Sequence, residues 1–202
     1  GHKINKEDLQ IAESLYCEAV NAFDRIKNKN KFRAFIKDFN EFFSLVTKMY
    51  EGQVGVEEEF CSDIRTQMVK LIERANNYAK GKHIFKVFKP EKNDFVNRLW
   101  NFTRMVNKSS TLVILIDLNE LNILHEDEVR ALIEVKKHLE DKGIEVGIIA
   151  GGCDARRIIN IFDSIKPVEE FNLFRSEFDA ILGMLYNQDS FQRITKKIKD
   201  VQ

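Results

Sequence analysis

The feature of this sequence that most constrains the fold is a nearly unbroken run of aliphatic residues from Thr111 to Leu118. A strand that faces water on one side alternates apolar and polar residues, whereas a strand covered on both faces carries apolar residues at nearly every position. The run therefore predicts the central strand of a sheet that is covered by other elements on both faces.

The segments on either side of this run alternate between strand and helix patterns. Further strand patterns occupy residues 84–88, 146–150 and 171–174. Helix patterns occupy residues 94–106, 126–142, 154–165 and 177–186, with Asp94 as an expected N-cap and Gly143 as an expected stop. Strands that alternate with helices are joined by crossovers and pair mainly in parallel. Residues 82–188 are therefore predicted to form an α/β domain with a mostly parallel mixed sheet of about four strands.

Residues 1–81 show helical periodicity and almost no strand pattern. Apolar residues recur at helical spacing over residues 9–26, 32–50 and 56–75, and polar or glycine-containing turns separate these segments. Three amphipathic helices joined by short turns are typical of an antiparallel bundle. This part of the chain is therefore predicted to be an all-α three-helix bundle. Residues 189–202 predict one further C-terminal helix.

Composition and charge argue against several classes of function. The 32 basic and 32 acidic side chains balance, so no excess positive potential favours general nucleic-acid binding. No apolar run reaches the roughly 18 to 20 residues that cross a bilayer, and the first residues lack the apolar core of a signal peptide. The three cysteines are far apart and odd in number, which is typical of reduced thiols. We expect a cytoplasmic protein that binds neither nucleic acid nor membrane.

Two motifs flank the loop that follows the central strand. Ile116-Asp117-Leu118-Asn119 ends the strand, and His125-Glu126-Asp127-Glu128 opens the next helix. Together with Asp154-Ala155-Arg156-Arg157 further along the chain, these motifs have an order and spacing that resemble those of the STAS domain. That domain is the fold of bacterial anti-sigma-factor antagonists and stressosome proteins. The resemblance covers residues 111–182 and extends more loosely back to Lys82.

The turn at the start of this helix departs from the family pattern. In STAS domains that act as switches, it carries a phosphorylatable Ser or Thr, which aligns here with Glu126, and a second hydroxyl, which aligns with Asp127. Phosphorylation adds about −1.5 to −2 charge, which a helix N-terminus favours. The two acids place permanent negative charge at this position. We therefore expect no phosphorylation at this turn.

A second departure lies at the start of the α/β domain. The family usually has two strands before its first helix, whereas this sequence shows one, at residues 84–88. We expect the edge strand of the family to be missing, shortened or supplied by another segment.

The resemblance implies that the turn and the exposed side of the helix after it contact a protein partner. The partner-binding residues expected on this basis are His125, Glu126, Asp127, Glu128, Arg130, Glu134 and Lys137. A simpler interpretation also fits, because acids in a first helical turn stabilise any helix by about 0.3–1 kcal/mol each. Adjacent residues at a helix start do not converge on one ion as residues at i and i+4 do, so no metal site is expected here.

The segment Gly151-Gly152-Cys153-Asp154 lies between a predicted strand and a predicted helix. Its backbone N–H groups are candidates for binding a phosphate, but it lacks the established phosphate-loop patterns, and Asp154 would compete with the anion as N-cap. A helix N-terminus also lowers the pKa of a thiol, yet no histidine is evident in the sequence as a partner for Cys153. We favour a simple helix start.

Two functions from different classes follow. The resemblance implies a non-enzymatic regulatory module that binds an anti-sigma-factor kinase-like protein or another STAS protein, with a helical module that dimerises or senses a signal. The alternative is a nucleotide- or metal-binding α/β enzyme domain, von Willebrand A-like or doubly wound, that uses the loops after Leu118 and Ala150. The sequence shows no Ser-His-Asp set, nucleophile elbow or paired metal histidines. We therefore favour the regulatory module and expect no catalytic residues and no cofactor.

Overall fold

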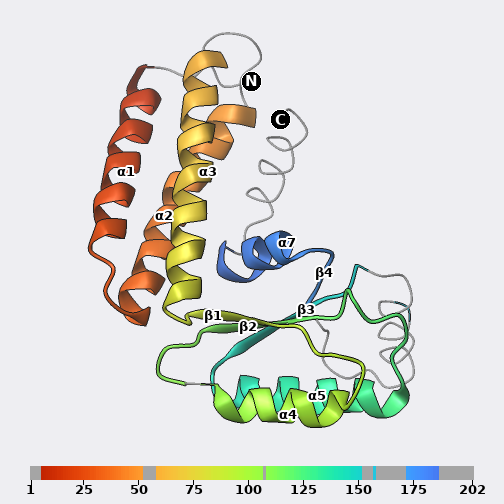
Figure 1. Cartoon of the computed structure of the whole chain (residues 1–202). Coiled ribbons are helices and arrows are strands. Elements are labelled where there is room, and N and C mark those ends of the chain that lie inside the picture. The colour runs from red at the N-terminus through yellow and green to blue at the C-terminus, as the bar shows by residue number, and fades with distance from the viewer. Residues whose placement is uncertain (1–5, 52–57, 107, 152–156, 158–171, 187–202) are drawn as a thin grey trace. The chain divides into compact units, whose positions relative to one another are not determined.

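The computed structural model of the chain describes residues 6–51, 58–106, 108–151, 157 and 172–186 (Figure 1). The chain divides into two compact units. The first contains residues 1–81 and 185–202, and the second contains Lys82–Met184. Apart from Arg157, the helices expected over residues 154–165 and 189–202 lie outside the described residues.

The first unit, here called the helical unit, contains α1 (Lys6–Asp24), α2 (Lys29–Glu51) and α3 (Glu58–Gly81). The Asn28 side chain accepts a hydrogen bond from the backbone N–H of Lys31 at 3.0 Å, which caps the start of α2. The phenylalanines of α2 are buried on the face predicted by their spacing, and each contributes about 1.5–3 kcal/mol by leaving water. They are Phe32, Phe35, Phe39, Phe42 and Phe43.

The core of the helical unit also contains a residue from the far end of the chain. Tyr186 is fully buried, its ring lies edge-on to Phe39 at 5.8 Å, and its hydroxyl donates to Oδ1 of Asn76 at 3.3 Å. Tyr186 ends a short π-helix, η1 (Leu182–Tyr186), which continues α7 (Glu177–Ile181). The sequence pattern assigned residue 186 to the α/β domain, whereas Leu185 and Tyr186 group with the helices.

The second unit, here called the α/β unit, is built on a four-stranded sheet with the order β1-β2-β3-β4. The strands are β1 (Phe85–Phe88), β2 (Val113–Asp117), β3 (Glu145–Ile149) and β4 (Asn172–Phe174). All three pairings are parallel, so the prediction of a mixed sheet was wrong. A parallel pair requires a long crossover, and long connections separate every consecutive pair of these strands. Every residue of β2 is buried, as its unbroken aliphatic run predicts.

Helices cover the two faces of this sheet (Figure 1). On one face, α4 (Phe95–Met105) and α5 (Glu126–Asp141) pack against Ile114, Ile116 and Ile148. On the other face, α7 contacts β2, β3 and β4. The packing there is close at Gly147, where an added Cβ would lie 2.9 Å from the Leu115 side chain.

The predicted stop of α5 is present in the structure, whereas the predicted N-cap of α4 differs from the usual form. Gly143 follows α5 with a φ of 79°, a left-handed conformation suited to glycine, as expected for a stop. Asp94 occupies the N-cap position of α4, but it has a φ of 58° and caps no backbone N–H with its side chain. Its carboxylate instead accepts a hydrogen bond from the Asn97 side chain at 2.8 Å.

No helix within the described part of the chain combines the length and hydropathy that a membrane span requires.

Candidate functional site

The loop between β2 and α5 shows one aliphatic side chain to solvent. Leu118, Leu121 and Leu124 are buried in the core below α5, and the N–H of Leu121 bonds to the carbonyl of Leu118 at 3.0 Å. These three anchors hold the loop against the sheet. Ile123, next to the last anchor, is 54% exposed. Ile123 was not among the residues predicted for the site, although it lies outside the i, i+3 spacing of the three leucines, which indicates exposure.

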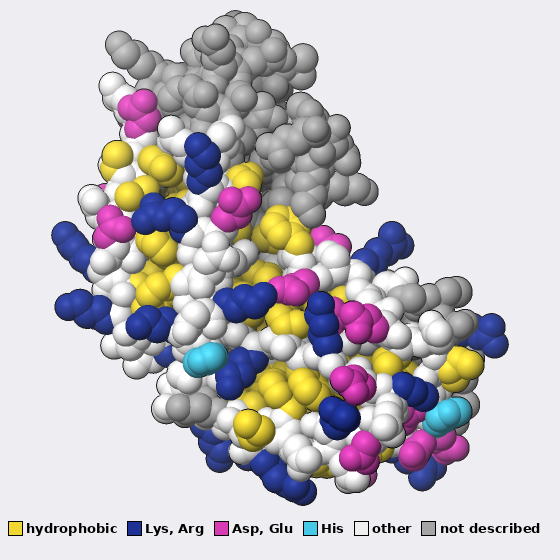
Figure 2. Space-filling model, viewed as in Figure 1, with side chains coloured by type: hydrophobic (Ala, Val, Ile, Leu, Met, Phe, Trp, Pro, Cys, Tyr) yellow, Lys and Arg dark blue, Asp and Glu magenta, His cyan; other side chains and the backbone are white. Residues whose placement is uncertain are grey.

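The four residues at the start of α5 divide into an exposed set and a buried one. His125 is the N-cap, with extended backbone at φ −87° and ψ 162°. His125, Glu126 and Asp127 are exposed, whereas Glu128 is buried. Figure 2 shows this end of α5, where acidic side chains gather beside basic ones and a histidine. Glu126 and Asp127 therefore lie at the surface, where the helix dipole favours them and a partner can reach them.

Glu128 lies under this surface. Its side chain is 6% exposed and forms an ion pair with the ammonium group of Lys92, which lies between β1 and α4. Its Oε1 also accepts a hydrogen bond from the backbone N–H of His125 at 2.9 Å. Of the seven expected partner-binding residues, Glu128 is thus placed where it supports the loop and cannot make broad contact with a partner.

The exposed side of α5 continues the surface along the helix. Arg130, Glu134 and Lys137 are all exposed. They follow Glu126 at successive spacings of four, four and three residues, which place them on one stripe of the helix. Arg130 pairs with Glu126 at 2.5 Å between Nη2 and Oε1, an exposed i, i+4 pair that adds little stability. We call Ile123, His125, Glu126, Asp127, Arg130, Glu134 and Lys137 the docking surface.

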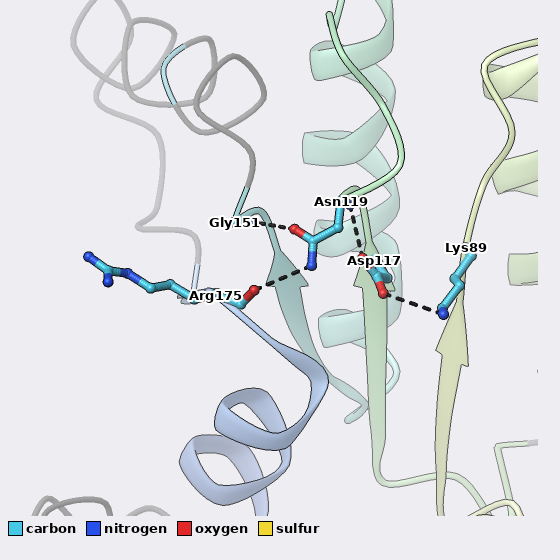
Figure 3. Close-up of polar contacts among 5 residues, drawn as sticks. All are labelled: Lys89, Asp117, Asn119, Gly151 and Arg175. Carbon is cyan, nitrogen blue, oxygen red and sulfur yellow. Dashed lines mark hydrogen bonds and ion pairs between the residues drawn. The ribbon is translucent and has the colours of Figure 1, made fainter. Parts of the chain in front are cut away.

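A second polar cluster lies at the carboxyl ends of the strands (Figure 3). The Asn119 side chain accepts a hydrogen bond from the N–H of Gly151 at 2.5 Å and donates to the carbonyl of Arg175 at 3.3 Å. The N–H of Asn119 bonds to Asp117 at 2.9 Å, and Lys89 lies 3.9 Å from the other oxygen of that carboxylate. One amide therefore ties together the ends of β2, β3 and β4.

This arrangement bears on the expected phosphate-binding segment. The N–H of Gly151 already has an acceptor in Asn119, so it is not free for an anion. An added Cβ at Gly151 would lie 2.7 Å from the carbonyl oxygen of Arg175, which explains why glycine stands there. The rest of the segment, residues 152–154, lies outside the described residues. Within the described ranges, no group of three or more His, Cys, Asp or Glu side chains is arranged to hold a metal ion.

Comparison with known proteins adds no family to this description. Neither the models of known protein families nor the curated proteins contain a match to this sequence. The fold itself therefore defines the chain: a unit of packed helices and an α/β unit with a four-stranded parallel sheet.

Proposed function

We propose that this chain is a non-enzymatic, cytoplasmic regulatory protein whose α/β unit resembles an anti-sigma-factor antagonist of the STAS type. The docking surface binds a protein partner, either an anti-sigma-factor kinase-like protein or another STAS protein. The helical unit, a three-helix bundle, dimerises or senses a signal. The position of the phosphorylatable hydroxyl is occupied by Glu126 and Asp127, so a kinase does not switch this surface.

The observation that carries the proposal is the combination of fixed acids and an exposed aliphatic side chain at one turn. Helix stability alone accounts for Glu126 and Asp127, because acids in a first turn interact favourably with the dipole. It does not account for Ile123, which is 54% exposed beside two buried leucines of the same loop. Protein interfaces place apolar side chains at the centre and polar ones at the rim, so the composition of this turn suits a protein partner.

The chemistry of the surface indicates the partner it fits. Glu126, Asp127 and Glu134 outnumber Arg130 and Lys137, so the surface is acidic overall. A complementary partner presents basic side chains to the first turn of α5 and an apolar pocket to Ile123. Charge complementarity of this kind sets specificity and association rate more than affinity.

The arrangement of the sheet supports docking over the nucleotide- or metal-binding alternative. In open α/β sheets, ligands bind beyond the carboxyl ends of the strands where the strand order reverses. The four described strands follow one another in chain order without a reversal. At their carboxyl ends, Asn119 joins the segments after β2, β3 and β4. A ligand between those segments would have to break these bonds.

A capture experiment with charge reversal tests the proposal. The protein is immobilised, bound proteins are identified by mass spectrometry, and the capture is repeated with Glu126→Lys combined with Asp127→Lys. Asp141→Lys, an exposed site at the other end of α5, is the matched control. We expect an ATP-binding kinase-like regulator or a STAS protein to be captured by the parent and the control but lost with the double variant. Equal capture by the double variant, with its fold intact by circular dichroism, contradicts the proposal.

A further inference from the structure

Lys92 contacts the loop that carries the docking surface although it belongs to a different segment of the chain. Its ammonium group donates to the carbonyl oxygen of Ile123 at 2.8 Å and pairs with the carboxylate of Glu128. The three residues come from two segments more than thirty positions apart, as the separations of 31 and 36 residues show. Lys92 therefore connects the β1–α4 segment to the β2–α5 segment.

Lys92 holds the loop next to the exposed Ile123, directly at the carbonyl of that residue and through Glu128 at the N–H of His125. The same Oε1 of Glu128 that meets Lys92 also accepts the N–H of His125. The backbone is thus held at the carbonyl of Ile123 and at the N–H of His125, and the Leu124 side chain between them is buried. With these three attachments, the direction in which Ile123 points is set by Lys92 and Glu128 as well as by the leucine anchor.

The burial of Glu128 distinguishes this ion pair from an ordinary surface pair. A pair between two exposed side chains contributes little, because water solvates both charges nearly as well. Here the Lys92 side chain is 44% exposed, but the Glu128 side chain is 6% exposed. Removing the ammonium group leaves a carboxylate with little access to water, so the loop has to move to hydrate it.

We infer that Lys92 is a positioning residue, which holds the β2–α5 loop in the conformation that displays the docking surface. The role of this conformation in partner binding rests on the proposed function. Neutralising Lys92 releases the carbonyl of Ile123 and exposes Glu128 to water, and the loop between Leu121 and His125 opens. The sheet and α5 keep their structure, because their core residues do not include Lys92.

Hydrogen exchange followed by mass spectrometry tests this without a partner, so its outcome does not depend on the proposed function. The variants are Lys92→Met, which keeps most of the aliphatic stem, and Lys92→Arg, which keeps the charge. Lys86→Met, which removes an equal charge from β1, is the control. We expect the amide of His125, which donates to Glu128, to exchange about ten- to a hundredfold faster in Lys92→Met, as the loss of a charge-assisted hydrogen bond implies.

The same experiment defines the results that overturn the inference. Protection of β2 amides serves as the internal reference, and we expect it to be unchanged in all variants. Lys92→Arg is expected to restore the exchange rate of the loop, and Lys86→Met is expected not to alter it. Unchanged loop exchange in Lys92→Met overturns the inference. Equal acceleration in β2 also overturns it, since Lys92 would then act on the stability of the whole unit.

Discussion

Replacement of Tyr186 is expected to destabilise the helical unit, although the residue lies far from the helices in sequence. Tyr186→Ala removes a fully buried ring that contacts Phe39 and a hydroxyl that bonds to Asn76. Truncating a buried aromatic residue to alanine costs about 3–5 kcal/mol, from lost transfer energy and the cavity left behind. Against a typical domain stability of about 5–15 kcal/mol, this is a large share.

Tyr186→Phe separates the two parts of this loss. It keeps the ring and removes the hydroxyl, so it loses only the part-buried hydrogen bond to Oδ1 of Asn76, which is worth about 0.5–1.5 kcal/mol. The comparison also has a pH dependence, because burial raises the pKa of Tyr186 above its usual value near 10.0. The folded helical unit favours the neutral phenol, so its stability is full below pH 10 and falls as the pH rises above it. Tyr186→Phe has no phenol to ionise at this position, so this part of the loss of stability above pH 10 disappears.

Urea unfolding followed by two spectroscopic signals distinguishes destabilisation of the helical unit from destabilisation of the α/β unit. The single tryptophan, Trp100, lies in α4 and reports on the α/β unit, whereas far-UV circular dichroism includes the helices of both units. With a slope of about 1–3 kcal/mol per molar urea, Tyr186→Ala lowers the midpoint of helix loss by roughly 2 M. We expect the tryptophan transition to shift less than the helix transition. If circular dichroism shows the parent midpoint for Tyr186→Ala, the assignment of this residue to the helical core is refuted.

Three further predictions concern the α/β unit. Gly151→Ala places a Cβ 2.7 Å from the carbonyl oxygen of Arg175 and is expected to destabilise the unit by about 1–3 kcal/mol, measured by tryptophan fluorescence in urea; an unchanged midpoint contradicts the stated contact. Thermal unfolding with nucleotides or divalent ions is expected to show no saturable rise of several degrees, and such a rise would favour the enzyme alternative. Incubation with an anti-sigma-factor-type kinase and ATP is expected to leave the peptide from Leu124 to Val129 unmodified; a phosphorylated residue there contradicts the account of the turn.

Much of the fold could be predicted because local patterns report burial directly. The unbroken run in β2 and the spacing of Val129, Leu132 and Leu139 in α5 predicted elements that the structure contains. Alternation of strands and helices also predicted parallel pairing. The prediction of a mixed sheet was wrong, since all the described pairings are parallel.

The candidate site was predicted less completely. Burial of Glu128 was detectable, because Glu128, Leu132, Val135 and Leu139 follow the i, i+4, i+7 and i+11 positions of one helix face. The prediction that Glu128 binds a partner was based on the charge of the acidic run and not on this periodicity. The partners of Lys92 and Tyr186 were not detectable in this way, since contacts across 36 and 110 positions depend on how separate elements pack. No periodic pattern encodes them.

Photo-crosslinking from the docking surface tests the central claim most directly. A photoreactive phenylalanine derivative replaces Ile123 in one variant and Asp141 in another, and each is irradiated with the protein captured by the parent chain. Both positions are exposed; Ile123 lies in the loop just before α5, and Asp141 is the last residue of that helix. The account predicts a crosslinked complex from position 123 that is lost when Glu126 and Asp127 are changed to lysine, and no complex from position 141. A complex that forms equally from both positions, or that survives the charge reversal, contradicts it.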